Sequence, residues 1–159
     1  MKDCIAKHGA DINGTDNPGN KAPLVFACER KFTEIVKFLL SRSDLVKVNI
    51  IPNPLALACT YFTEYTDRRR QHTGGRSYSP KLELVQLLLS HPRLNVNASH
   101  EIISNRRMWS TKGPFSALHA AVRGAETQIV KLLLEDERMD PTLVDSDGVC
   151  IGIYCNSIL

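Results

Sequence analysis

The 159-residue chain has few aromatic residues, 6% of the total with a single Trp, and no long hydrophobic run. Its best apolar stretches, Ile35–Leu40 and Leu84–Leu89, are interrupted by Lys37 and Gln86. Both fall far short of the ~18 apolar residues that suggest a membrane-spanning helix. Residues 1–11 contain no apolar core of the kind that a signal peptide requires. The sequence therefore predicts neither a membrane-spanning helix nor a secretory leader.

Sequence signatures of catalysis and metal binding are also missing. There is no GxSxG or HExxH motif, and Gly74-Gly75 lacks the Lys-Ser or Lys-Thr that completes a phosphate-binding loop. The five cysteines include no CxxC pair, and Cys150 and Cys155 stand five residues apart rather than at a zinc-ligand spacing. We therefore predict no catalytic activity, no cofactor and no metal site. The cysteine pattern also predicts a reducing environment, that is, an intracellular protein of the cytoplasm or nucleus.

The composition that remains is that of one folded domain. Hydrophobic residues make up 43% of the chain and charged residues 23%, with a net charge of +3. This apolar content is sufficient for a core, and the net charge is too small to keep the chain disordered. We therefore expect a single globular domain over residues 1–159.

An internal repeat runs through this domain. Three similar segments are built largely from Leu, Ala, Val and Cys: Ala22–Cys28, Asn53–Cys59 and Ser116–Val122. Each is followed by a second segment with paired aliphatic residues: Glu34–Leu40, Glu83–Leu89 and Gln128–Leu134. The copies close with Val48-Asn49, Val96-Asn97 and Asp140-Pro141, and partial copies stand at Lys7–Asn13 and Asp145–Ile151. Such self-similarity predicts an architecture of stacked units.

Both segments of each copy have the features of short helices. A Pro suits the first turn of a helix in two copies, and Asn53 and Ser116 can cap the helices that follow them. The second segments carry aliphatic residues at helical spacing, with Lys131 on the water-facing side of the third. Helices this short are marginal alone, so each unit must bury its apolar face against the next. We expect Leu57 and Leu132 on these buried faces.

The unit resembles the ankyrin repeat, with its TPLHxA-like start and EIVKLLL-like second helix. The resemblance implies an all-α fold, an ankyrin-type solenoid of helix-turn-helix repeats joined by hairpin loops, with two loop insertions. The implied units are a half repeat at 1–13, repeats at about 14–49, 50–97 and 98–140, and a partial repeat at 141–159. Only one copy keeps the His of the motif, His119, which we interpret as a framework residue rather than a catalytic one.

Two insertions interrupt the regular spacing. The helical segments start 12 residues apart in the first and third copies but 30 apart in the second, which places about 18 extra residues near 61–79. A second excess of about 10 residues extends the hairpin finger at 98–115. The segments 61–81 and 98–115 together carry eight basic and three acidic residues, whereas the rest of the chain has a net charge of −2. Insertions on a solenoid fall in loops, often on the binding side, so these two are functional candidates.

Each insertion has a functional and a plain interpretation. Arg106-Arg107-Met108-Trp109 combines residue types that are enriched at protein interfaces. Alternatively, Trp109 folds back and packs its own finger. The run Arg68-Arg69-Arg70 is either a binding element or a solvated loop.

The leading interpretation is a non-catalytic protein-interaction module or scaffold that holds a partner on its concave face and basic loops. The resemblance implies partner contacts at the inner-helix ends, and the insertions add basic and aromatic candidates. The expected partner-binding residues are Glu29, Arg30, Thr60, Tyr61, Arg68, Arg69, Arg70, Arg106, Arg107, Met108, Trp109 and Arg123. The two basic insertions favour an acidic peptide or an acidic helix face as the partner. Two alternatives remain open: a binder of nucleic acid, other anionic polymers or anionic lipid such as phosphoinositides, and a structural spacer within a larger protein.

Overall fold

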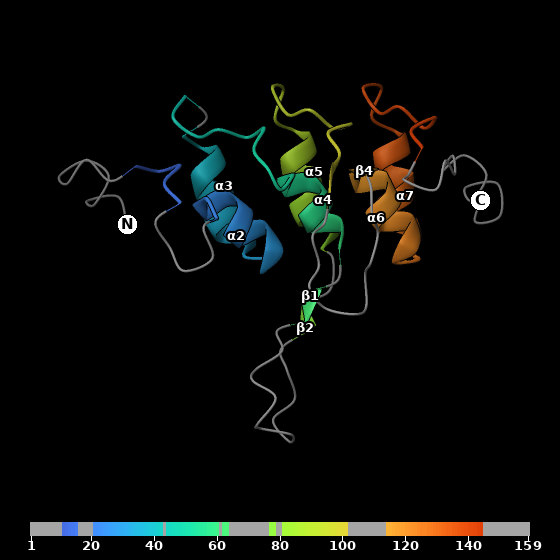
Figure 1. Cartoon of the computed structure of the whole chain (residues 1–159), viewed down its shortest axis with the longest axis horizontal. Coiled ribbons are helices and arrows are strands. Elements are labelled where there is room, and N and C mark those ends of the chain that lie inside the picture. The colour runs from blue at the N-terminus through green and yellow to red at the C-terminus, as the bar shows by residue number, and fades with distance from the viewer. Residues whose placement is uncertain are drawn as a thin grey trace, which may run out of the picture.

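The computed structural model of the chain describes residues 11–15, 21–42, 44–60, 62–63, 77–78, 81–101 and 114–144. Within these ranges, six short helices form two layers (Figure 1). The inner layer contains α2 (Pro23–Glu29), α4 (Pro54–Cys59) and α6 (Ala117–Arg123). The outer layer contains α3 (Thr33–Leu40), α5 (Leu82–Leu89) and α7 (Thr127–Leu134). None of the described helices has the length and apolar character that crossing a membrane requires.

Each inner helix packs on the outer helix of its own repeat and on the inner helix of the next repeat. The contacts are α2 with α3 and α4, α4 with α5 and α6, and α6 with α7. The outer helices follow the same order, α3 with α5 and α5 with α7. This arrangement confirms the predicted all-α solenoid of helix-turn-helix repeats. The repeat boundaries stay a prediction, and most of the partial copies at 1–13 and 141–159 lies outside the described residues.

Local sequence explains where the inner helices begin. A Pro occupies the first turn of α2 and of α4, where a missing N–H costs no hydrogen bond. Asn53 caps α4, because its side-chain oxygen accepts from the backbone N–H of Leu55 at 2.9 Å. Ser116 and His119 form a reciprocal capping box at the start of α6. These contacts confirm the predicted caps and give the buried His119 a framework role.

Small and branched side chains fill the space between the layers. The fully buried core includes Leu24, Val36, Leu55, Leu84, Val85, Leu88, Leu118, Val130 and Leu133. Leu57 and Leu132 are less buried than we expected. Both are half-buried and pack against the margin of the core. Leu57 lies two residues from Leu55, which is about 200° around a helix. It therefore faces away from the side that Leu55 buries.

Two short antiparallel ribbons lie within the predicted insertions. β1 (Phe62–Thr63) pairs with β2 (Ser77–Tyr78) between α4 and α5. β3 (His100–Glu101) pairs with β4 (Pro114–Phe115) ahead of α6. In Figure 1 the first ribbon lies below the C-terminal end of α4, whereas β4 adjoins the N-terminal end of α6. The two insertions therefore start from opposite ends of the inner layer.

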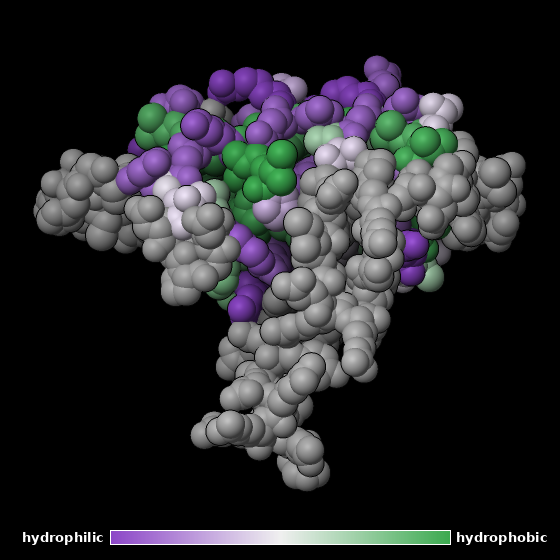
Figure 2. Space-filling model, viewed as in Figure 1, coloured by the Kyte–Doolittle hydropathy of each residue, from purple (hydrophilic) through white to green (hydrophobic). Residues whose placement is uncertain are grey.

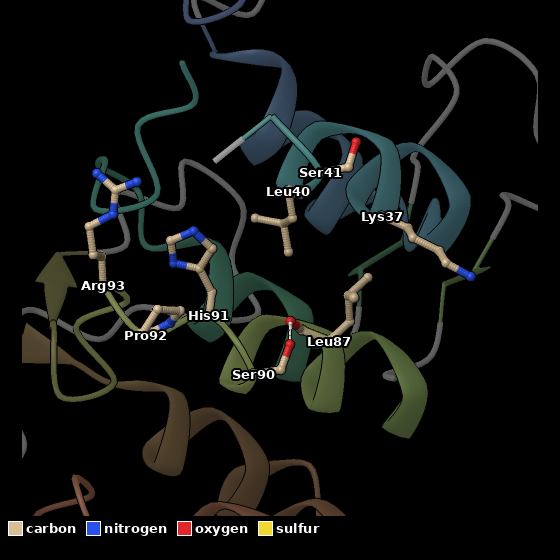
Figure 3. A pocket seen from close by; sticks show the side chains of 8 residues that line it. All are labelled: Lys37, Leu40, Ser41, Leu87, Ser90, His91, Pro92 and Arg93. Atoms are coloured by element: carbon tan, nitrogen blue, oxygen red, sulfur yellow. Dashed lines mark hydrogen bonds between the residues drawn. The ribbon is translucent and has the colours of Figure 1, made fainter. Parts of the chain in front are cut away.

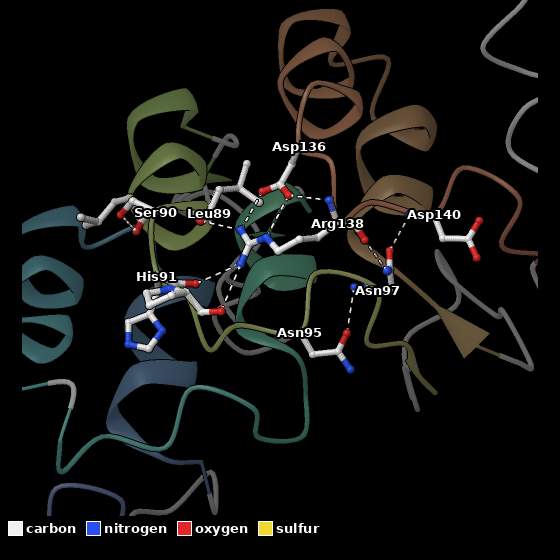
Figure 4. Close-up of polar contacts among 10 residues, drawn as sticks. Leu89, Ser90, His91, Asn95, Asn97, Asp136, Arg138 and Asp140 are labelled. Carbon is white, nitrogen blue, oxygen red and sulfur yellow. Dashed lines mark hydrogen bonds and ion pairs between the residues drawn. The ribbon is translucent and has the colours of Figure 1, made fainter.

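An asparagine near the end of each unit connects one polar loop to the next. The side-chain amides of Asn13, Asn49 and Asn97 each bond to two backbone groups of the next loop. The amide N–H donates to one carbonyl, and the amide oxygen accepts from the backbone N–H two residues after that carbonyl. The partners are Leu45 and Lys47 for Asn13, Arg93 and Asn95 for Asn49, and Arg138 and Asp140 for Asn97, all at 2.7–2.8 Å. We call these contacts the asparagine bridges, and Figure 4 shows the third. Three of the connected loops, those that follow α3, α5 and α7, lie at the upper edge of Figure 1, and this edge is largely hydrophilic in Figure 2.

Candidate functional site

The C-terminal ends of the inner helices form one strip, because α2, α4 and α6 stack in order with the same chain direction (Figure 1). Four of the expected partner-binding residues lie along it. Glu29 and Arg30 stand at the end of α2, Thr60 follows α4, and Arg123 ends α6. We call this strip the inner-helix row and define it by Phe26, Glu29, Arg30, Phe32, Leu57, Thr60 and Arg123.

Two aromatic rings accompany Arg30 at the α2 end of the row. Phe26 is 41% exposed and Phe32 is 38% exposed. Their ring centroids lie 6.5 Å apart with an interplanar angle of 60°, and the guanidinium carbon of Arg30 lies 5.1 Å from the centroid of the Phe26 ring. Tilted ring pairs and cation–π contacts both stabilise such a cluster. The cluster thus presents a rigid apolar surface with a positive charge beside it.

The other three expected residues differ in what they offer a partner. The Glu29 carboxylate pairs with the Lys21 amine at 2.6 Å, and its side chain is only 9% exposed. Thr60 Oγ1 donates to the backbone carbonyl of Leu57 at 2.8 Å, where α4 ends. Arg123 is exposed at the far end of the row. Arg30 and Arg123 are the basic side chains among the residues that define the row.

A buried lysine supports the row from behind. Lys31 follows α2 with a φ of 59° and is 2% exposed. Its amine donates to the backbone carbonyls of Leu57 and Ala58, at 3.1 Å for Ala58, and so caps the C-terminal end of α4. Burial lowers the pKa of Lys31 to about 8. The amine fixes the end of α2 relative to the end of α4.

The buried thiols of α2 and α4, Cys28 and Cys59, have no nucleophilic character at neutral pH. Burial raises the pKa of Cys28 and of Cys59 to about 12, so both remain protonated. Both fill the core as small apolar residues. Within the described ranges, no group of three or more His, Cys, Asp or Glu residues is placed to hold a metal ion.

The remaining expected residues lie outside the described residues: Tyr61, Arg68, Arg69, Arg70, Arg106, Arg107, Met108 and Trp109. Their role stays a prediction. The ribbons nevertheless locate the bases of their segments. The first insertion leaves the molecule from the end of α4, in the middle of the inner-helix row, and the second starts at the opposite end of the inner layer.

Sequence reasoning missed three residues of this site. Phe26 occupies the position that holds Leu57 and Ala120 in the other repeats, so an oversized residue at a repeated position was the available signal. Phe32 carried no comparable signal by itself. Lys31 aligns with Ala125, and both have a positive φ. A charged residue in a turn normally indicates exposure, so the burial of Lys31 had no local signature.

Comparison with known proteins identifies one part of the chain. Residues 115–146 match the family described as Ankyrin repeat, and this span covers α6, α7 and the loop that follows. Comparison with the curated proteins finds no match. Ankyrin repeats act in general as protein-interaction modules and are typically non-catalytic.

Proposed function

We propose that this chain, which carries an ankyrin repeat at residues 115–146, holds a partner protein along the inner-helix row. The observation that carries the proposal is the exposed pair of Phe26 and Phe32 with Arg30 over one ring. A soluble surface that keeps two large rings in water at one place is a surface suited to being covered. The expected absence of catalysis and the intracellular location, cytoplasm or nucleus, are parts of the same proposal.

The partner fits the row through apolar anchoring and charge. The rings of Phe26 and Phe32 lose water when a partner covers them, which is the main source of affinity at such anchors. Arg30 and Arg123 stand at the two ends of the row, so an acidic segment lying along it meets a positive charge at each end. The Lys31 amine holds α2 and α4 in place before binding, which lowers the ordering cost of association.

The insertions extend this surface in our proposal. The first one leaves from the centre of the row, so Tyr61 and the run Arg68–Arg70 would contact the middle of a bound partner. Their charge would speed association more than it would strengthen the final complex. The finger with Trp109 starts at the other end of the inner layer and would contact the partner from that side.

The test compares two aromatic residues that each lie under an arginine. Phe26 belongs to the row, whereas Phe38 lies on the outer helix α3 with the guanidinium carbon of Arg42 6.0 Å from its ring centroid. A photoreactive benzoyl-phenylalanine at position 26 or 38 of the full chain, expressed in its own cells, is cross-linked and the captured proteins are identified. We expect position 26 to capture a protein that position 38 does not.

The captured protein is then titrated against variants. Phe26→Ala combined with Phe32→Ala should weaken binding by about thirtyfold or more, as expected for anchors worth ~2 kcal/mol. Phe38→Ala is the matched control and should bind normally. Unchanged affinity of the double variant would rule out the row as the binding surface. Binding that needs only Arg68–Arg70 and falls steeply with salt would instead favour an anionic polymer or lipid.

A further inference from the structure

A separate pocket opens in the outer layer, between the C-terminal ends of α3 and α5 (Figure 3). Its volume is about 370 Å³, within the range that accommodates a ring-sized group. The lining residues are Lys37, Leu40, Ser41, Leu87, Ser90, His91, Pro92 and Arg93. They come from the first and second repeats, and none belongs to the inner-helix row. The pocket is thus a second candidate contact site that does not depend on the proposed function.

The two cations of the lining do not direct a charge at a ligand. Figure 3 shows the amine of Lys37 turned away from the pocket, so this residue lines it through its methylene stem. Arg93 already takes part in an interaction of its own. None of the eight lining residues is acidic. The pocket therefore favours a neutral ligand over a charged one.

His91 lies in the pocket wall with the polar atoms of its ring unused. It is 7% exposed, and neither ring nitrogen has a hydrogen-bond partner among the described residues. Buried polar atoms without partners are rare, and each one calls for an explanation. Burial and the neighbouring charges of Arg93 and Arg138 lower the pKa of His91, so the ring is neutral at pH 7. A neutral imidazole contains one N–H donor and one acceptor nitrogen.

The next junction along the solenoid makes use of the polar atoms at the matching position. Asp136 follows α7 where His91 follows α5. Its carboxylate oxygens lie 2.7 and 2.9 Å from guanidinium nitrogens of Arg138, and Arg138 donates to the backbone carbonyl of Leu89 at 2.7 Å (Figure 4). The polar side chain after α7 is thus held by hydrogen bonds within the chain. The ring of His91 has no such bonds among the described residues, which leaves its acceptor nitrogen to a ligand.

A hydroxyl carried on an aromatic ring suits this lining. Leu40, Leu87 and Pro92 supply apolar surface that a ring can cover. The hydroxyls of the two lining serines already donate to their own helices, at 2.7 and 2.8 Å. A phenol brings a single O–H that needs an acceptor, and His91 has one. A carboxamide would bring two N–H groups and a carbonyl, more than the lining can satisfy.

The mouth of the pocket indicates how such a group arrives. Five of the lining residues are exposed, namely Lys37, Ser41, Ser90, Pro92 and Arg93. The pocket is therefore open to solvent at its rim and closed at the side of Leu40, Leu87 and His91. An open pocket of this kind suits one anchoring side chain of a protein whose backbone stays outside.

We propose that the pocket between α3 and α5 receives the side chain of a tyrosine from a partner protein. The ring packs on Leu40, Leu87 and Pro92, and the hydroxyl donates to the acceptor nitrogen of His91. Because α3 belongs to the first repeat and α5 to the second, the tyrosine bridges two repeats on the outer layer.

The direct test is a titration of the full chain with two short peptides. The probe is the acetylated and amidated tripeptide Ala-Tyr-Ala, and the control is Ala-Phe-Ala, which lacks only the hydroxyl. Ring NMR signals of His91 are followed against pH at millimolar peptide. We expect the tyrosine peptide to bind about three- to tenfold more tightly, the size of one hydrogen bond, and to lower the pKa of His91 further because it bonds to the neutral ring. Equal affinity of the two peptides, or a raised pKa of His91, would overturn the proposal.

Two further titrations separate this ligand from other classes. Raising the salt from about 50 to about 500 mM should leave the affinity of the tyrosine peptide unchanged, since neither the hydroxyl nor the ring is charged. A steep fall would show an anion site and contradict the proposal. The free phenol p-cresol should bind no more tightly than the peptide. Clearly tighter binding of p-cresol would assign the pocket to a small molecule instead of a partner protein.

Three variants complete the test. His91→Leu should reduce the affinity for the tyrosine peptide to that for the phenylalanine peptide, while the melting temperature stays the same or rises, because an unpartnered polar group is replaced by an apolar one. His91→Gln keeps a hydrogen-bond acceptor and should bind with intermediate affinity. Lys37→Gln is the matched control and should bind normally, since its amine faces away from the pocket. A folded His91→Leu protein that still prefers the tyrosine peptide, or a loss of binding in Lys37→Gln, would contradict the assignment.

Discussion

The two junctions between neighbouring repeats are held together in different layers. At the first junction the buried amine of Lys31 reaches the carbonyl end of α4 in the inner layer, while the outer helices leave a pocket. At the second junction Arg138 reaches the carbonyl end of α5 in the outer layer, and Phe62 stands at the sequence position of Lys31. An asparagine bridge is common to both. The first junction therefore depends on a group that titrates near neutral pH, and the second depends on a guanidinium that does not.

The largest loss of stability is expected for a residue of the helix that takes part in both junctions. Leu55 is fully buried in α4, the inner helix that packs on α2 and on α6. Leu55→Ala should lower the free energy of unfolding by roughly 2–5 kcal/mol, because it removes buried apolar area and leaves a cavity. Chemical denaturation measures this loss. The half-buried Leu57 on the same helix is the control, and an equal loss for Leu57→Ala would contradict the assigned helix faces.

Measuring stability against pH should distinguish the contribution of the first junction, which contains Lys31, from that of the second. Because the pKa of Lys31 falls from 10.5 to about 8 on folding, the unfolded chain binds more protons between these values. Stability from this group therefore rises with pH across that window, by up to about 1.4 kcal/mol per pH unit, and is lost as the pH falls toward 8. Lys31→Met keeps an apolar side chain of similar length and removes the titrating group. The wild type should gain stability relative to Lys31→Met as the pH rises from about 8.

Subtracting the stability of Lys31→Met from that of the wild type removes the contribution of the two buried thiols, which both proteins contain. The raised pKa values of Cys28 and Cys59 act in the opposite direction above their ordinary value of 9.0, since the unfolded thiols ionise first. Urea denaturation at several pH values gives the two stability curves. Parallel curves from pH 7 to 10 would show that Lys31 does not titrate as its burial indicates.

The smallest effect is expected at the second junction, because the Arg138 side chain is 37% exposed. Arg138→Gln should cost about 0.5–1.5 kcal/mol, a value limited by solvent screening. Hydrogen bonding to Arg138 lowers the pKa of Asp136, so this contribution is present above the ordinary carboxyl value of 3.8 and is lost as the pH falls below it. A double-mutant cycle with Asp136→Asn measures the coupling. Simple additivity of the two substitutions would show that the pair contributes nothing.

Much of the fold could be predicted because its causes are local. Aliphatic residues at helical spacing gave the helices, and the polar residues Asn53 and Ser116 gave two of their starts. The ends of the inner helices were expected as a candidate surface only because the unit resembles the ankyrin repeat. The degree of burial was harder, since Leu57 looks like its neighbours in composition and differs only in angular position around the helix.

Contacts between distant segments could not be derived in this way. Lys31 is buried because two carbonyls at the end of α4, 26 and 27 residues away, accept from its amine. The asparagine bridges span 32 to 46 residues, and no short window of sequence contains both partners. Their only trace was the recurrence of Asn near the end of successive units. A side chain that bonds to backbone leaves no mark on the residue type of its partner.

The asparagine bridges also form a continuous series of hydrogen bonds between successive loops along one edge of the molecule. Thr142 occupies the place of Asn97 in the following unit, but its backbone N–H and its hydroxyl both turn back to the Asp140 carboxylate, at 2.9 and 2.6 Å. A threonine side chain is also too short to reach two backbone groups as an asparagine does. The series of asparagine bridges therefore ends at Thr142. Under tension along the solenoid axis, the four loops that the three bridges connect would share the load.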